Sequence, residues 1–434
     1  MLLLLVGCFL GFLETPSLQI FPGPDLHQPV TVVDAAGGVC VSVQLDRWDA
    51  GHRAVMVDAL GSMGVRTLRH DLLWSYVESS RGVWDWTSED AWMESAEDAG
   101  FDVIAMMAYG NAWASSDPNA DEYYPPDDPA DFATFAAETA ARYGDRLHRY
   151  EIWNEPNAGY RFWKVGDPPA LSGDPAGYAA LFVPAADAIH AAAPDAEVQI
   201  GGTFYLDMGI IGGPEFVTEA ASKCCPNPEP RFLEVADGLA YHPYTTYPPR
   251  VGPEESDDFE VPIWDMHTEM RASAVNTLPL SATEAGWPSW GDVDEDTQAA
   301  FLVRGFALAQ ADGVRDYCVY TLEDWDDPEN PEANFGLYRP NSSERKPAGE
   351  ALATLASNIA GMDCHGRAEW PLGLPDGVFA VRWAGPEGSA TAIWTTSGEQ
   401  GVTMPASEGA CEGDQTVIAG TTPVWVLETL CEHN

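Results

Sequence analysis

Two glutamates in this 434-residue chain stand in surroundings that do not favour a charge. Glu155 follows the largely apolar and aromatic stretch Tyr150–Asn154, and Glu284 interrupts the apolar stretch Pro279–Trp287. An ionised carboxylate in such surroundings is costly unless it is paired. Each glutamate taken singly could pair with an arginine or cap a loop. Two carboxyl groups held about 5–5.5 Å apart can instead share the work of breaking a glycosidic bond.

The two glutamates fall within a regular alternation of short apolar runs and longer amphipathic stretches, which begins near residue 39. Apolar runs of this kind are typical of parallel strands that are buried on both faces. The eight predicted strands are Val39–Leu45, Val65–His70, Asp102–Ala108, His148–Pro156, Ala196–Phe204, Gly238–Tyr244, Pro279–Trp287 and Val314–Asp324.

An amphipathic stretch follows each predicted strand. These stretches are Arg53–Met63, Ser88–Ala99, Ala130–Tyr143, Gly177–Ala193, one helix within Glu215–Ala236, one within Phe259–Ala274, Glu295–Ala311 and Glu344–Ile359. Eight strand–helix units are what a (β/α)8 TIM barrel requires. A doubly wound open sheet is the competing arrangement, but no GxGxxG turn follows the first strand. We therefore predict an α/β fold in which residues 29–361 form a TIM barrel, with Pro29–Val33 as an outer strand.

After residue 362 the alternation gives way to short apolar runs separated by Gly, Pro and Ser. Such spacing is typical of antiparallel strands joined by tight turns. The predicted strands are Gly377–Trp383, Ala390–Thr395, Gly401–Met404, Gln415–Ile418 and Val424–Leu427. We predict that residues 362–434 form a small β-sandwich behind the barrel.

Functional side chains of a TIM barrel lie at the C-terminal ends of its strands. Glu155 ends the fourth predicted strand and Glu284 lies near the end of the seventh, and these two strands face each other across the barrel mouth. Arg69, His242 and Tyr244 end the second and sixth strands. The barrel therefore predicts that these polar side chains meet around one cavity.

Two segments resemble the catalytic strands of the clan A glycoside hydrolases. Tyr150–Asn157 (YEIWNEPN) is similar to their acid/base strand, and Thr283–Trp287 (TEAGW) is similar to their nucleophile strand. Within the clan the chain is most similar to glycoside hydrolase family 39 and its bacterial exopolysaccharide-hydrolase-like members. The resemblance covers about residues 38–360 and extends to WSYVESSRGVWDW, AYGNAWAS, YHPY and NFGLYRPNSSERKP.

The resemblance implies a double displacement that the chemistry of two carboxyl groups also requires. Glu284 would attack the anomeric carbon, and Glu155 would protonate the leaving oxygen and then deprotonate the incoming water. Glu155 must therefore begin the cycle protonated. The expected result is hydrolysis with retention of configuration at an O-glycosidic bond, with a β linkage expected.

The same resemblance implies supporting roles for four residues. Asn154 would hydrogen-bond the sugar 2-hydroxyl, and Arg69 would hold Glu284 in its ionised form. His242 and Tyr244 match a strand-six pair, with Tyr244 as the donor to the nucleophile. Each has an alternative: a loop-closing Asn154, a structural ion pair of Arg69 with another acid, and a core histidine at 242.

Sixteen tryptophans exceed what is usual for a chain of this length, and flat rings often line sugar sites. Trp325, at the end of the eighth strand, is the candidate for the sugar platform, although Glu323–Asp327 is unusually acidic for that position. Trp287, Trp113 and Trp74 are further candidates for sugar contacts. Each is as well explained as part of the core of a large barrel.

The chain carries 68 acidic and 21 basic residues, for a formal net charge of −47. Such a surface repels phosphate backbones, so nucleic acid is excluded as a partner. The same charge weighs against a polyanionic substrate unless salt screens it. No CxxC or histidine-rich spacing suggests a zinc site, and we expect neither a metal nor an organic cofactor.

The first 13 residues are apolar but too few to span a membrane. They resemble the core of an export signal, and we predict a leader over residues 1–20 and a secreted, cell-surface or periplasmic protein. Leu5–Cys8 also resembles a lipobox, so membrane attachment through a lipidated Cys8 is an alternative. Export permits disulfides. Cys40 and Cys318 fall on strands that neighbour each other in the barrel, but connectivity does not follow from sequence.

The sequence thus predicts a retaining glycoside hydrolase acting on an extracellular oligo- or polysaccharide. One alternative is an exo-acting β-xylosidase-like enzyme. The other is a catalytically silent carbohydrate-binding protein that kept the barrel, which the presence of both glutamates disfavours. The sugar, the linkage and the oligomeric state do not follow from the sequence.

Overall fold

The computed structural model describes residues 39–431, except residue 118 and residues 206–209, 224–230, 245–248, 256–261, 275, 368–373, 405 and 407–409. The predicted leader, Cys8 and the outer strand at Pro29–Val33 lie outside this range. Among the described residues, no helix is both long enough and apolar enough to cross a membrane.

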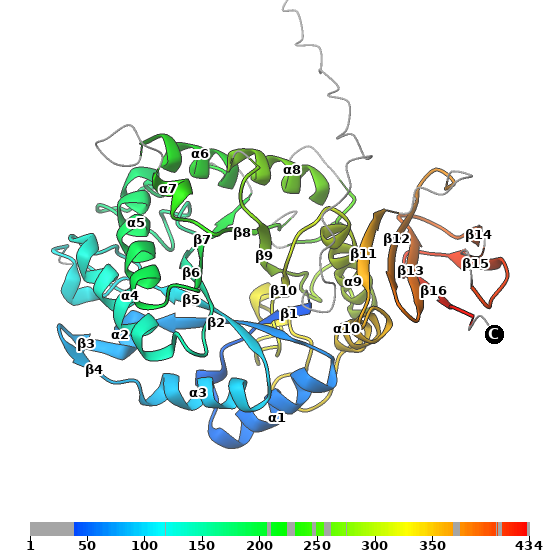
Figure 1. Ribbon diagram of the computed structural model, residues 1–434, viewed down its shortest axis with the longest axis horizontal. Coiled ribbons are helices and arrows are strands. Elements are labelled where there is room, and N and C mark those ends of the chain that lie inside the picture. Colours follow the sequence, from blue (N-terminus) through cyan, green and yellow to red (C-terminus); the bar gives the residue numbers. More distant parts are fainter. Residues whose placement is uncertain are drawn as a thin grey trace, which may run out of the picture.

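Eight parallel strands close into a barrel, as Figure 1 shows at the centre of the molecule. The strand order around the barrel is β1, β10, β9, β8, β7, β6, β5 and β2. Their bounds are β1 (Val39–Ser42), β2 (Thr67–Leu73), β5 (Asp102–Ala108), β6 (Arg149–Asn154), β7 (Glu197–Phe204), β8 (Gly238–His242), β9 (Leu280–Ala285) and β10 (Tyr317–Val319). This closed sheet confirms the predicted TIM barrel. Its strands are buried on both faces, as their apolar sequences predicted.

Helices surround the barrel and connect its strands (Figure 1). They are α1 (Ala50–Ser62), α3 (Thr87–Asp98), α4 (Pro129–Tyr143), α5 (Pro175–Ala192), α6 (Gly213–Lys223), α7 (Arg231–Glu234), α8 (Ile263–Ser273), α9 (Glu295–Ala311) and α10 (Pro347–Asn358). Aspartates start several of them, because a carboxylate can accept a backbone N–H that has no partner within the helix. Asp49, Asp128, Asp174 and Asp294 cap α1, α4, α5 and α9 in this way.

The loop after β2 carries the short helix α2 (Trp74–Val77) and a small hairpin of β3 (Glu78–Ser80) and β4 (Val83–Trp84). Three short 3-10 helices, η1 (Leu45–Arg47), η2 (Ala112–Ala114) and η3 (Pro331–Asn334), lie in the loops after β1, β5 and β10. The predicted eighth strand was too long. Only Tyr317–Val319 pairs in the sheet, and the acidic segment after it forms a loop.

The C-terminal region forms two further sheets beside the barrel, at the right of Figure 1. One has four strands, β11 (Asp363–Arg367), β12 (Val378–Gly385), β13 (Gly388–Thr395) and β16 (Val424–Thr429), and the other pairs β14 (Gln400–Met404) with β15 (Gln415–Ala419). Apolar residues from both sheets, including Ile393 and Val402, share a small core. Strand β11 was not predicted, because its residues DCHGR carry little apolar signal.

The four-stranded sheet is joined to the barrel through α9, whose described side chains are almost all buried. Arg304 on α9 pairs with the buried Glu254, and Glu254 also accepts a hydrogen bond from Trp394 Nε1 on β13 at 2.6 Å. A buried pair of this kind is tolerated when further donors satisfy the carboxylate. The helix is therefore covered by the barrel on one side and by the C-terminal sheet on the other.

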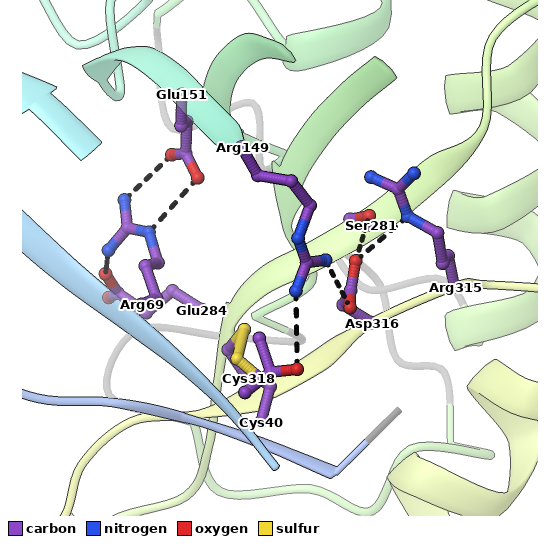
Figure 2. The surroundings of a disulfide bond; sticks show 10 residues. Cys40, Arg69, Arg149, Glu151, Ser281, Glu284, Arg315, Asp316 and Cys318 are labelled. Atoms are coloured by element: carbon purple, nitrogen blue, oxygen red, sulfur yellow. Dashed lines mark hydrogen bonds and ion pairs between the residues drawn. A yellow bond between two sulfur atoms is a disulfide. The ribbon is translucent and has the colours of Figure 1, made fainter. Parts of the chain in front are cut away.

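A disulfide joins the first and last strands of the barrel. Cys40 on β1 and Cys318 on β10 are register partners in the sheet and are bonded to each other. A second disulfide joins Cys411 and Cys431, and Cys364 is free and buried. Figure 2 shows the first bond below the Arg69 cluster and beside a polar network of Arg149, Asp316 and Ser281.

Candidate active site

A cavity of about 680 Å³ opens where the barrel strands end. Residues at or just beyond the ends of β1, β2, β6, β7, β9 and β10 line it, and Glu155 and Glu284 are both among them. The cavity is therefore at the C-terminal mouth of the barrel, where the sequence analysis predicted the site.

Glu155 and Glu284 approach each other closely across this cavity. One oxygen of each carboxyl group and one ring nitrogen of His242 all lie within 4.8 Å of one another. Retaining glycosidases hold their two carboxyl groups about 5–5.5 Å apart, whereas inverting enzymes need about 6.5–9.5 Å for a water molecule. The separation is that of the retaining geometry.

An unusual backbone presents two consecutive side chains to the cavity. Trp153 has a φ of 71° and Glu155 a φ of 44°, both in the left-handed region that side chains rarely adopt. Each such residue costs on the order of 1–3 kcal/mol, which the surrounding contacts must offset. Trp153 Nε1 donates to the Phe162 carbonyl at 2.7 Å, and the Glu155 N–H donates to the Gly202 carbonyl at 2.8 Å. Asn154 and Glu155 can therefore both line the cavity, which a regular strand would not allow.

His242 contacts the Glu155 carboxyl group from the protein interior, outside the cavity. Its Nδ1 lies 2.8 Å from Glu155 Oε1, and the ring is fully buried outside the cavity lining. Gly202 is needed beneath the ring, because an added Cβ would lie 2.2 Å from His242 Nε2. The structure therefore places His242 as a positioning residue for Glu155 rather than as a contact of the sugar.

Two donors converge on Glu284. The Tyr244 hydroxyl donates to Oε1 at 2.6 Å, and Arg69 Nη1 donates to Oε2 at 3.4 Å. Burial, followed by the negative charge of Glu284, raises the pKa of Tyr244 well above its usual value, so this hydroxyl remains a donor. Both interactions favour the ionised carboxylate that a nucleophile requires.

Arg69 is itself held by Glu151, which the sequence analysis did not single out. Arg69 donates through Nη2 to Glu151 Oε1 at 2.9 Å and through Nε to Oε2 at 3.2 Å, and Figure 2 shows the two parallel contacts. Burial acts to lower the pKa of Arg69, but the charge and hydrogen bonds of Glu151, together with the charges of Glu284 and Asp71, outweigh burial and raise the pKa. A glutamate inside a buried strand requires such a partner, which is the signal that could have revealed it.

Asn154 completes the Arg69 cluster. Its Oδ1 accepts from Arg69 Nη2 at 2.9 Å, which orients the side-chain amide so that its NH₂ group can donate into the cavity. The alternative of a loop-closing Asn154 does not describe this geometry, and the contact with the sugar 2-hydroxyl stays a prediction. Arg69 forms the structural ion pair that was the alternative for it, with Glu151, and it also contacts Glu284.

Of the predicted tryptophan contacts, only Trp325 lines the cavity, where 42% of its surface is exposed. Trp287 is buried outside the cavity, packs on Phe301 and donates to the Val251 carbonyl at 2.7 Å. Trp113 donates to the Glu78 carbonyl, and its ring is covered by the Arg81 guanidinium. These two rings, like the fully buried Trp74, are occupied by structural contacts.

Other aromatic rings take the place expected for those tryptophans. Trp48, Tyr76 and Tyr160 line the cavity from the segments that follow β1, β2 and β6. Tyr76 and Tyr160 are exposed at 64% and 49%. Tyr76 lies within the quoted stretch WSYVESSRGVWDW and Tyr160 lies three residues after YEIWNEPN, but nothing in the sequence separated these rings from aromatic residues of the core.

Glu323 is a further cavity residue that the sequence analysis did not select. Its side chain is 9% exposed, and His52 Nε2 contacts Oε2 at 3.1 Å. Oε1 is buried and has no hydrogen-bond partner among the described residues. Buried polar atoms are rarely left unpaired, and this oxygen retains the capacity to accept one more hydrogen bond.

Glu155, His242 and Glu284 also form the group of described residues that could hold a metal ion. The donor set fits a cation poorly, because Arg69 and Tyr244 already donate to Glu284 and the guanidinium adds a fixed positive charge. A reaction that needs no cofactor therefore stays a prediction with this physical support.

No protein-family model matches the sequence, and no curated protein does either. Solved structures do match the fold. A family 39 glycoside hydrolase from Bacteroides cellulosilyticus WH2 is similar over 92% of this chain and 82% of that chain, with a TM-score of 0.69 and 20% identity. A GH39 β-xylosidase from Caulobacter crescentus covers 89% of this chain and 83% of its own, with a TM-score of 0.61 and 18% identity.

A GH30 endoxylanase from Clostridium papyrosolvens C71 covers 94% of this chain and 98% of its own length, with a TM-score of 0.61 and 13% identity. At these identities the likeness establishes a shared fold, which is a barrel with added C-terminal sheets. It agrees with the resemblance to clan A and family 39 that the two glutamate segments indicated.

Proposed function

We propose that this protein is a retaining glycoside hydrolase of the family 39 type. The observation that carries the proposal is the pair Glu155 and Glu284, whose oxygens lie within 4.8 Å across a cavity large enough for more than one sugar ring. The solved structures with this fold are named as glycosidases, which supports the same class.

The proposed reaction has two displacement steps. Glu284, held ionised by Arg69 and Tyr244, attacks the anomeric carbon while Glu155 donates a proton to the leaving oxygen. The glycosyl–Glu284 ester is then hydrolysed by water that Glu155 deprotonates. His242 can keep its hydrogen bond to Glu155 in both steps, because an imidazole nitrogen can donate to the carboxylate or accept from the carboxylic acid.

Hydrogen bonds to the sugar complete the site. The Asn154 amide is placed to donate to the 2-hydroxyl, an interaction that strengthens as charge develops at the anomeric carbon. Glu323 Oε1 is placed to accept from another hydroxyl, and Trp325, Trp48 and Tyr160 offer faces for further rings. An oligo- or polysaccharide with β linkages is the proposed substrate.

A β-xylosidase-like exo-enzyme is the second candidate within the class, because β-xylosidases are among the structural neighbours. The open, aromatic mouth favours a chain that continues beyond one sugar. A silent carbohydrate-binding protein is disfavoured, because Arg69 and Tyr244 contact Glu284 as a working nucleophile needs.

Action outside the cell is part of the proposal. Two disulfides among the described residues support an oxidising compartment, since such bonds are rare in reducing cytosol. The leader over residues 1–20 and the alternative of a lipidated Cys8 remain predictions. Mass analysis of the mature N-terminus after expression in the native host would decide between them.

A panel of aryl β-glycosides tests the proposed activity. The wild type should release phenol from at least one sugar, and the double variant E155Q/E284Q should release none while keeping the same melting temperature. If the wild type hydrolyses no aryl glycoside and no polysaccharide but binds oligosaccharides, the alternative of a catalytically silent binding protein is correct.

A further inference from the structure

Arg161 is a cation of the cavity that the proposed mechanism does not use. It lines the cavity from the segment after β6, six residues beyond Glu155. Its guanidinium carbon lies 4.5 Å from the centre of the Phe162 ring, another cavity residue. Its guanidinium makes no ion pair or hydrogen bond to any residue that the structure describes, and only its backbone N–H is bonded, to the Ala158 carbonyl at 3.1 Å. The Phe162 ring therefore positions the Arg161 guanidinium, and the N–H groups of the guanidinium remain available to a ligand.

An open guanidinium is unusual in this protein. The chain has 68 acidic residues and 21 basic ones. Most arginines form ion pairs with acidic side chains, as Arg304 does with Glu254 and Arg315 with Glu197. A cavity arginine without such a partner leaves five N–H donors for a ligand.

The turn after β6 ties Arg161 to the acid/base, because the Ala158 N–H donates to the Glu155 carbonyl at 2.9 Å and the Arg161 N–H donates to the Ala158 carbonyl at 3.1 Å. Burial acts to lower the pKa of Arg161, and the charges of Glu155, Glu332 and Glu284, in that order, outweigh burial and raise it. Since Glu155 would protonate the leaving oxygen, a group beside Glu155 faces the leaving-group sugar.

We propose that Arg161 forms an anion-binding subsite on the leaving-group side of the cavity, which takes a carboxylate or sulfate substituent on the sugar next to the cleaved bond. The proposal rests on the proposed hydrolase function. Guanidinium groups bind both anions through paired, charge-assisted hydrogen bonds. The overall negative charge then acts as a filter, because it repels polyanions in general while this one position accepts a single anionic group.

The competing role for Arg161 is to balance the acids around it. Glu332 lines the same cavity, and its pKa is raised by burial and lowered by Arg161. An arginine that served only this purpose would affect every substrate alike. The subsite proposal requires an effect that depends on the charge of the leaving group.

The test uses leaving groups that differ in charge but little in acidity. The three substrates are 4-(carboxymethyl)phenyl, 4-(sulfooxymethyl)phenyl and neutral 4-(carbamoylmethyl)phenyl β-glycosides of the sugar that the wild type hydrolyses fastest. The wild type should show a higher kcat/KM on at least one charged substrate than on the neutral one. R161Q should lose about tenfold on that substrate and little on the neutral one. The charged group with the larger loss identifies carboxylate or sulfate as the natural ligand.

R66Q is the matched control. Arg66 lies just before β2, at the opposite end of the barrel, outside the cavity, and its removal changes the net charge equally. It should keep the wild-type ratio between charged and neutral substrates. R47Q removes the other open cavity arginine, which follows β1, and should also keep the ratio.

Equal losses of R161Q on all three substrates, or loss of the ratio in R47Q or R66Q instead, would overturn the proposal. A different result contradicts the hydrolase proposal, namely that the wild type turns over no glycoside. In that case, calorimetric binding of the carboxymethyl and carbamoylmethyl glycosides to wild type and R161Q still tests the subsite.

Discussion

The surroundings of Glu155 and Glu284 differ although their exposure is similar. Their side chains are 10% and 16% exposed, so burial does not separate their roles. Glu155 contacts His242, a partner that can lose its charge, whereas Glu284 contacts Arg69, a partner that cannot. We infer that the protonation chemistry of the neighbouring side chain divides the proposed acid from the proposed nucleophile in this cavity.

The largest effect is expected on the nucleophile side. Glu284→Gly should lower kcat by at least about 10⁴-fold, because no covalent intermediate can form. Azide should restore turnover of an activated aryl β-glycoside and give a glycosyl azide of inverted configuration. Near-normal hydrolysis by Glu284→Gly without azide would show that the nucleophile is another residue.

The acid/base side should respond according to the leaving group. Glu155→Ala should lose about 10³-fold on substrates with poor leaving groups and far less on activated aryl glycosides, which depart without a proton. The measurement is kcat/KM across aryl glycosides of rising phenol pKa. Equal losses across the series would contradict the acid role.

Glu151→Gln tests the support behind the nucleophile. The variant keeps the shape of the side chain but removes the charge that holds Arg69, so kcat should fall roughly 10²-fold with little change in KM. Breaking a buried ion pair also costs roughly 3–5 kcal/mol of stability, so thermal unfolding is recorded beside the kinetics. A folded variant with wild-type kcat would show that Arg69 needs no second acid.

Glu89 is a buried acid that contacts neither a histidine nor an arginine among the residues that the structure describes. It lies in the first turn of α3, and burial raises its pKa to about 7. The folded state therefore holds a proton that the unfolded chain loses near pH 4.5, so its contribution to stability falls as the pH rises from about 4.5 to 7. Glu89→Gln should be more stable than the wild type by on the order of 2 kcal/mol above pH 7.

Denaturant unfolding at several pH values measures this effect. The difference between Glu89→Gln and wild type should vanish below pH 4.5, where both side chains are neutral. A constant difference at every pH would indicate a change in shape rather than in charge.

Tyr244→Phe should give the smallest loss, roughly tenfold in kcat, because Arg69 still contacts Glu284. The raised pKa of Tyr244 predicts that its hydroxyl adds no alkaline limb to the pH–rate profile below about pH 10. If the variant removed an alkaline limb seen in the wild type, Tyr244 would be a titrating group and not a fixed donor.

The barrel was predictable because each of its strands is buried on both faces and reads as an apolar run. Glu155 and Glu284 were predictable for the same reason, since a charge at the end of such a run stands out. The fold class is confirmed by the closed eight-stranded sheet.

The residues that the sequence did not reveal depend on contacts between distant segments. Glu151 pairs with Arg69 from 82 residues away. Trp287 is buried by Phe301 and Val251, whereas Trp48 reaches the cavity, and the sequence around a tryptophan does not record which outcome applies.

The stereochemistry of hydrolysis tests the central claim most directly. Proton NMR of the sugar released early from a β-glycoside reports its configuration before mutarotation. The approach of Glu155 and Glu284 to within 4.8 Å predicts that the β-anomer appears first. First appearance of the α-anomer would mean that water attacks directly, and the assignment of Glu284 as nucleophile would be wrong.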